Sequence, residues 1–213
     1  MARAILLAAA AAGATALLAA SPTLAAEPFN GPYVGIQGGW QQNSNRLSVD
    51  VGNVETAYKM KKSGFEYGAQ IGLDGRMNDQ FVIGAEAFVS GSTGKNYFPD
   101  SDDGHVKAGR SFGLLARAGV LATPATLVYG TGGWENARFS FRGEGVDIGT
   151  NKNGWTLGAG IEQMLGENLS ARVEYRYSRF GKSNIEELDD VLDGKAQMRT
   201  TRNRILAGVN YRF

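Results

Sequence analysis

The sequence predicts an all-β protein: an eight-stranded antiparallel up-and-down transmembrane β-barrel, preceded by a cleaved signal peptide. Three observations lead to this fold class. Residues 1–26 have the composition of a secretory leader. Segments of about ten residues then alternate between apolar and polar positions, always in the same sense. Long and short connections alternate along the chain, as in membrane barrels with short turns at one end and long loops at the other.

The leader contains one charged residue, Arg3, followed by an uncharged run rich in alanine and leucine over residues 4–20. Small residues around Ala25 and Ala26 suit cleavage by signal peptidase. A permanent anchor is the alternative, because the apolar run is longer than a typical signal core. Alanine inserts only weakly into membranes, which favours the signal peptide. We therefore predict a signal peptide over 1–26 and an outer-membrane β-barrel domain over 27–213.

The remaining 187 residues contain 21 basic and 21 acidic residues, so this part of the chain is formally neutral. A neutral chain lacks the electrostatic footprint of a nucleic-acid-binding protein, and no nucleic-acid partner is expected. The absence of Cys excludes disulfides, thiolate zinc sites and Cys nucleophiles. A single His excludes a His-rich metal site. We expect no metal site and no cofactor.

Seven segments alternate clearly, with large apolar residues on one face and glycine or charged residues on the other. Their apolar faces are read at every second residue of 34–40, 65–73, 81–89, 112–120, 155–161, 169–177 and 205–213. The fifth strand, near 127–136, is weaker, because Gly130, Gly132 and Gly133 obscure its phase. The direction of Trp134 is not predicted. Together these segments give eight strands.

The expected connections alternate strictly in length: 42–63, 75–80, 92–108, 122–126, 137–153, 166–168 and 181–198. With the N-terminus on the inner side, every long connection falls outside. Aromatic side chains at the strand ends should then form girdles at the two interfaces. The expected outer girdle is Trp40, Phe65, Tyr67, Phe112, Trp155 and Tyr177, and the expected inner girdle is Tyr33, Phe81, Tyr129, Tyr211 and Phe213.

Several strand motifs carry a family resemblance: GPYVG at 31–35, GAEA at 84–87, YGTGG at 129–133, GWTLGAGIE at 154–162 and VEYRY at 173–177. Over 31–213 the chain resembles the small eight-stranded surface barrels of proteobacteria known as opacity-family porins or OmpA-like barrel-domain proteins. The resemblance implies a location in the bacterial outer membrane, extracellular long loops, and roles in envelope integrity or host contact. Some relatives carry a hemin-binding label. The last strand, with Tyr211 and Phe213, resembles the signal that the outer-membrane assembly machinery recognises.

The polar faces, taken as the barrel interior, carry five acidic and five basic residues. They are Glu66, Asp74, Glu86, Glu162 and Glu174, and Arg117, Arg172, Arg176, Arg204 and Arg212. An eight-stranded barrel is just wide enough for side chains to fill it, so these charges should pair and plug the lumen. Glu86 and Arg117 lie near the middle of adjacent strands, and glycines on the same face should make room for the arginines. A narrow ion path is the alternative.

Signals for catalysis and metal binding are weak, and we expect no enzyme and no catalytic residues. The single His105 lies beside Asp102 and Asp103 in a long loop, with Ser101 and Ser111 nearby, and is best interpreted as a solvated loop residue. The Gly158-Ala159-Gly160 segment lacks the third glycine of a dinucleotide fingerprint, because Gln163 stands there. A calcium loop starting at Asp100 would end at Ser111 rather than Glu.

The leading hypothesis is an integral barrel with structural and surface-exposed roles. A small porin is the alternative, and a surface binder of hemin or a host ligand, through His105, Tyr97 and Phe98, is a third interpretation. Loop 181–198 carries net charge −3 and loop 42–63 net charge +2. Such loops could contact lipopolysaccharide, outer-membrane lipid or a host ligand, or simply be solvated. A soluble lipocalin-like barrel, the rival fold, would have to expose the face of glycines and charges.

Overall fold

The computed structural model describes residues 27–51, 54–93, 109–143, 146–181, 183–184 and 195–213. The predicted signal peptide, 1–26, lies outside them. The strands are β1 (Gly31–Val51), β2 (Val54–Arg76), β3 (Phe81–Ser92), β4 (Ser111–Thr123), β5 (Thr126–Gly143), β6 (Val146–Met164), β7 (Leu169–Phe180), β8 (Ser183–Asn184) and β9 (Lys195–Arg212). No helix in these ranges is long and apolar enough to span a bilayer.

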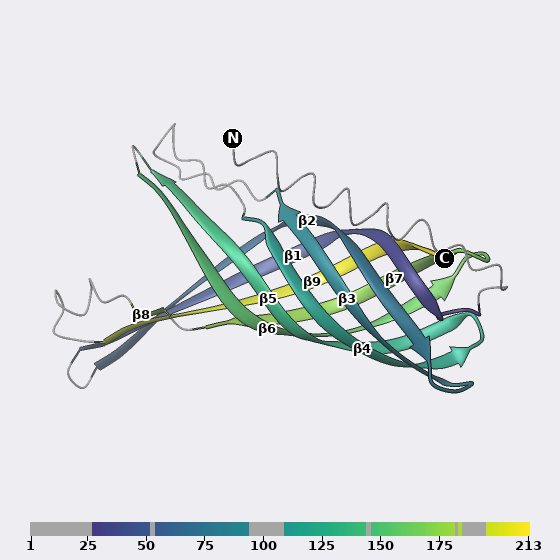
Figure 1. The fold of residues 1–213 in the computed structure, drawn as a ribbon. Helices are drawn as coiled ribbons and strands as arrows, with labels where there is room; N and C mark the ends of the chain where they lie inside the picture. The colour runs from purple at the N-terminus through teal and green to yellow at the C-terminus, as the bar shows by residue number, and fades with distance from the viewer. Residues whose placement is uncertain (1–26, 52–53, 94–108, 144–145, 182, 185–194) are drawn as a thin grey trace.

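The strands form a closed antiparallel barrel (Figure 1). Each long strand pairs with its neighbour in the chain, and β1 also pairs with β9, which closes the sheet. The two-residue strand β8 pairs with β9 beyond the end of β7, at Ser183↔Met198 and Asn184↔Gln197. It therefore lengthens an existing ladder and adds no new strand to the wall. The predicted eight-stranded up-and-down topology is confirmed.

The prediction of long loops is wrong for two of the connections, because strands continue through most of their residues. β1 and β2 pair from Gly31↔Asp74 to Val51↔Val54, through most of 42–63, and β5 and β6 pair through 137–153. These hairpins project from one end of the barrel, and the turns at 77–80, 124–125 and 165–168 lie at the other (Figure 1). The expected loop 181–198 is also shorter, because β9 begins at Lys195. A two-stranded ribbon needs backbone hydrogen bonds but no apolar face, so the apolar pattern stops before the strands do.

The barrel exterior is apolar, as the alternation predicts. Ile36, Leu114 and Val173 are 70%, 61% and 58% exposed. A contiguous apolar belt of this kind suits lipid and not water. Trp134, whose direction the sequence left open, is 41% exposed and belongs to the outer girdle, where its ring meets Phe112 edge-on.

The inner girdle differs from expectation, because two of its expected members point into the barrel. Tyr33 and Tyr129 are buried in the interior, while Phe81 and Tyr211 are exposed on the outside. Phe213 packs edge-on against Tyr211, with 5.1 Å between the ring centroids. The phenol groups of Tyr33 and Tyr129 instead hydrogen-bond to interior carboxylates. Buried hydroxyl groups require such partners, so the charged interior explains their direction.

An apolar cluster fills the interior at the short-turn end. Phe29, fully buried, packs there with Val82, Leu127 and Tyr129. Phe29 precedes β1 in a turn in which the N–H of Asn30 donates to a carbonyl at 3.1 Å, and its φ is +60°. This conformation is uncommon for a residue other than glycine. It accompanies a backbone turn that buries the Phe29 ring in the barrel mouth.

Candidate functional site

Among the side chains that the structure describes, twelve charged ones occupy the barrel interior. All ten residues proposed from the sequence lie there, each at most 3% exposed. The two others are Glu135 and Arg202. Their contacts divide the twelve into three layers, named inner, middle and outer from the short-turn end to the long-hairpin end. Each layer contains two carboxylates and two guanidinium groups, so each is formally neutral.

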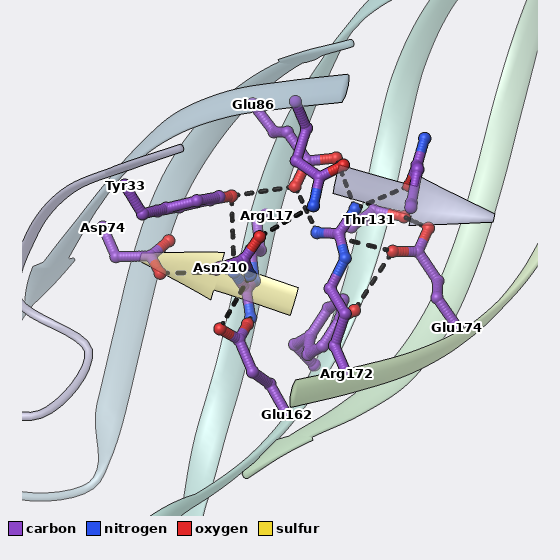
Figure 2. Close-up of polar contacts among 12 residues, drawn as sticks. Tyr33, Asp74, Glu86, Arg117, Thr131, Glu162, Arg172, Glu174 and Asn210 are labelled. Carbon is purple, nitrogen blue, oxygen red and sulfur yellow. Dashed lines mark hydrogen bonds and ion pairs between the residues drawn. The ribbon is translucent and has the colours of Figure 1, made fainter. Parts of the chain in front are cut away.

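The inner layer joins Asp74 and Glu162 to Arg117 and Arg212. Figure 2 shows Arg117 between the carboxylates of Asp74 and Glu162. Nη2 of Arg212 lies 2.9 Å from Oδ2 of Asp74 and 2.8 Å from Oε1 of Glu162. Arg117 bridges the same two carboxylates, at 3.2 Å from Asp74 and in a close contact with Glu162. Asn210 also donates to Glu162, at 2.9 Å. Four strands, β2, β4, β6 and β9, are thereby connected across the lumen.

The middle layer joins Glu86 and Glu174 to Arg172 and Arg176. Figure 2 shows Arg172 between Glu86 and Glu174. Arg172 contacts both carboxylate oxygens of Glu86, and Nε of Arg176 lies 2.7 Å from Oε1 of Glu174. Nη2 of Arg176 reaches Glu86 at 3.4 Å. The hydroxyl of Tyr33 donates to Glu86 at 2.8 Å and accepts from Arg117 of the inner layer at 3.4 Å. Tyr33 therefore links the two layers.

The outer layer joins Glu66 and Glu135 to Arg202 and Arg204. Arg204 contacts Glu135 at 3.2 and 2.5 Å and Glu66 at 3.4 Å. Nη1 of Arg202 lies 3.1 Å from Oε1 of Glu135. Ser178 donates to Glu135 at 2.7 Å and accepts from Arg204. Glu135, fully buried, is therefore the common partner of both arginines.

Aromatic rings pack against the guanidinium groups of the network. Cζ of Arg117 lies 3.9 Å from the centroid of the Tyr129 ring, and Cζ of Arg176 lies 4.7 Å from that of Phe88. A cation over a ring face is stabilised most where water is excluded. The expectation that glycines mainly make room for arginines is wrong at Gly72, where a Cβ would lie 2.4 Å from Cζ of the Tyr33 ring. At this position the glycine accommodates an aromatic ring.

Glu86 and Arg117 lie near the middle of the adjacent strands β3 and β4, as predicted, but their charges do not pair with each other. The register pairs Gly84 with Arg117 and Glu86 with Leu115, so the two charges are offset along the barrel. Arg117 belongs to the inner layer, whereas Glu86 belongs to the middle layer. The side-chain pairing follows this stagger and runs mostly across the lumen.

Sequence reasoning missed Glu135 and Arg202 for different reasons. Glu135 follows the glycines of the fifth strand, which hide the alternation. The sequence did contain a signal for Arg202, because it lies two residues before Arg204 and so shares its face of β9. The alternation predicted for the last strand starts at Arg204 and so does not reach Arg202.

Other residues singled out in the sequence fall into two groups, those that the structure describes and those outside its ranges. Ser111 is buried and its Oγ accepts a hydrogen bond from Arg202 at 2.8 Å. Residues 158–160 continue strand β6, as barrel packing requires. Within the described ranges no group of three or more His, Cys, Asp and Glu residues could hold a metal ion. The described ranges do not include Tyr97, Phe98, residues 100–104 or His105.

Comparison with known proteins agrees with this architecture. The family model for the outer membrane protein beta-barrel domain matches residues 6–213. The chain is 31% identical to a 31 kDa outer-membrane immunogenic protein of Brucella melitensis, covering 87% of this chain and 84% of the relative. It is 30% identical to a 25 kDa outer-membrane immunogenic protein of Brucella abortus, covering 86% and 78%.

Two solved structures share the fold at low sequence identity. Neisserial surface protein A gives a TM-score of 0.52 at 19% identity, with 86% of this chain and 98% of that chain covered. The outer membrane protein OprG of Pseudomonas aeruginosa gives a TM-score of 0.52 at 12% identity, with 87% and 97% covered. Together with the family match and the apolar exterior, these findings locate the protein in the bacterial outer membrane. The chain belongs to the outer membrane protein beta-barrel domain family.

Proposed function

We propose that the protein is a closed, non-enzymatic barrel that supports the outer membrane structurally and presents its long hairpins at the cell surface. The observation that carries this proposal is the neutral, layered charge network of the interior. Each of the twelve charged side chains has an opposite charge within 4.0 Å. A barrel filled in this way is a stable membrane element and a poor channel.

Ion passage would disrupt the network at every layer. A hydrated ion would have to separate paired charges, and an unpaired buried charge costs several kcal/mol. Removing one partner of a buried pair, for comparison, lowers the free energy of unfolding by about 3–5 kcal/mol. At the short-turn end it would also meet the apolar cluster around Phe29. Two different barriers, one charged and one apolar, therefore act in series along the lumen.

A narrow channel is the second candidate function, and unpaired polar atoms favour it. In the described interior, Nε of Arg117, Nη1 of Arg212 and Oδ1 of Asp74 have no hydrogen-bond partner, although all three side chains are buried. Buried polar atoms of this kind commonly bind ordered water. A connected row of such water molecules would give protons or small ions a path.

The surface role rests on the long hairpins and on the relatives. Two Brucella relatives are named outer-membrane immunogenic proteins, which fits surface exposure. We propose the same exposure for the end of this barrel formed by β1–β2, β5–β6 and β9, with a host ligand or lipopolysaccharide as partners. Tyr211 and Phe213 at the end of the last strand are proposed to contact the assembly machinery. Hemin binding through His105, Tyr97 and Phe98 stays a prediction.

Planar-bilayer recording tests the closed lumen. Purified wild-type protein should give no steady channels. Arg117→Ala should unbalance the inner layer and raise the conductance, or destabilise the barrel. Lys61→Gln, which removes an exposed cation outside the lumen, is the matched control and should stay silent. Large, stable, ion-selective channels in the wild type would refute the closed barrel and support the porin alternative.

A further inference from the structure

Two arginines lie directly opposite each other on the barrel exterior, with no counter-charge among the described side chains. Arg110, just before β4, lies opposite Arg138 of β5, whose N–H donates to the Arg110 carbonyl at 3.0 Å. Their neighbours Ser111 and Ala137 are buried inside, so by alternation both arginines point outward, and both are exposed. Like charges directly opposite on adjacent strands are destabilising. An anion between them would turn this repulsion into attraction.

A third cation and two tryptophans lie on the same outward face. Trp134 of β5 pairs in register with Trp155 of β6, and Trp155 pairs with Arg179 of β7. An open groove of about 550 Å³ runs past these side chains and past Asn153, over the bare backbone of Gly133 and Gly154. The groove lies where the apolar belt ends and the long hairpins begin. Arg179 lines the groove together with the two tryptophan rings, and Arg138 lies farther toward the hairpin end on the same face of β5.

The described charges on this face are of one sign. Among the side chains that the structure describes, no carboxylate lies within salt-bridge distance of Arg110, Arg138 or Arg179. The wall carboxylates whose side chains the structure describes are buried inside, namely Glu66, Asp74, Glu86, Glu135, Glu162 and Glu174, and Asp79 and Glu167 lie in turns at the opposite end. Three guanidinium groups thus lie on this face with no partner among the described carboxylates.

We propose that this outward face binds a phosphorylated glycolipid of the outer leaflet, of the lipopolysaccharide type. The guanidinium groups of Arg110, Arg138 and Arg179 would bind its phosphates, because planar guanidinium groups match phosphate oxygens in geometry and charge. The rings of Trp134 and Trp155 and the groove would hold its sugar backbone and the upper part of its acyl chains. A free anion would bind the arginines but would not fill the groove beside the tryptophans. An acyl chain alone would fill the groove but would not neutralise the arginines.

Binding of bisphosphorylated lipid A to the folded protein in detergent micelles, followed by native mass spectrometry, tests the proposal. The comparison lipid is the same molecule with both phosphates removed. Wild-type protein should bind the phosphorylated form at least about tenfold more tightly. Arg138→Gln and Arg179→Gln should each weaken that binding about tenfold, the usual scale for a lost charge-assisted hydrogen bond.

Lys61→Gln is the matched control, because it removes one exposed cation from β2, on another part of the wall. It should change the affinity by no more than about twofold, and gel migration should show that all variants are folded. Equal binding of the dephosphorylated lipid would overturn the proposal. So would a loss in Lys61→Gln as large as in Arg179→Gln, or complete displacement of the lipid by inorganic phosphate at equal concentration.

Discussion

Neutrality of each interior layer predicts that two destabilising substitutions in the outer layer should partly compensate each other. Glu135→Gln leaves Arg202 and Arg204 with one carboxylate, Glu66, and a net charge of +1 in the layer. Arg204→Gln leaves two carboxylates with one arginine and a net charge of −1. The double variant restores neutrality with Glu66 and Arg202. The prediction therefore concerns the coupling energy between Glu135 and Arg204.

The magnitude follows from the geometry. Arg204 and Glu135 are both fully buried and contact each other at 3.2 and 2.5 Å. Two unit charges about 4 Å apart attract by about 4 kcal/mol at an effective dielectric constant of about 20. Removing one partner of a buried pair usually costs about 3–5 kcal/mol, because the other charge stays buried and unpaired. The double variant should be at least about 2 kcal/mol more stable than the sum of the two single effects predicts.

Equilibrium unfolding by urea in lipid vesicles measures these free energies. Tryptophan fluorescence reports the transition, and the heat-modifiable shift on a gel independently reports the folded barrel. Urea is preferred to guanidinium chloride because its lack of charge leaves ion pairs unscreened. If the two substitutions add within about 0.5 kcal/mol, the outer layer is not a coupled unit and the reasoning is refuted.

Three further substitutions test other parts of the structure by the same unfolding measurement. Val173→Arg, in the middle of the apolar belt, should cost about 2–4 kcal/mol in lipid, and wild-type stability would contradict a lipid-facing position. Phe29→Ala should cost about 3 kcal/mol by opening a cavity at the short-turn end, and a loss below about 1 kcal/mol would show that the ring does not seal it. Gly133→Ala places a Cβ 2.0 Å from the Leu114 carbonyl and should cost about 1–3 kcal/mol, whereas Gly166→Ala, with nothing within 4 Å, should be neutral.

Most of the barrel was predictable because one physical rule governs its wall. Lipid on one side and packed polar groups on the other force a period of two along every strand, and residues such as Ile71 and Val173 follow it. The same rule places ten interior charges without any structure. The rule no longer predicts a strand where both faces of that strand meet the same environment. Beyond the membrane both faces of a hairpin meet water, so the continuation of β1 and β2 through 42–63 left no apolar pattern.

The pairing inside the barrel was not predictable from single strands. Glu86 and Arg117 lie on adjacent strands, yet strand stagger assigns them to different layers. Arg117 instead meets Glu162, a residue of β6, across the lumen. Such contacts depend on register and on the curvature of the closed sheet. Tyr33 illustrates the same limit, because its place near a strand end suggested an interfacial ring, whereas its hydroxyl serves the buried network.

The central claim, a lumen closed by three neutral layers and an apolar cluster, is tested most directly by ion leakage from vesicles that contain many copies of the wild-type protein. Proteoliposomes are loaded with K⁺, and its release is followed at increasing protein-to-lipid ratios, with gel migration to show that the protein is folded. The closed barrel predicts that the leakage rate equals that of protein-free vesicles at every ratio. A rate that rises in proportion to folded protein would contradict it and show that ions pass through the network.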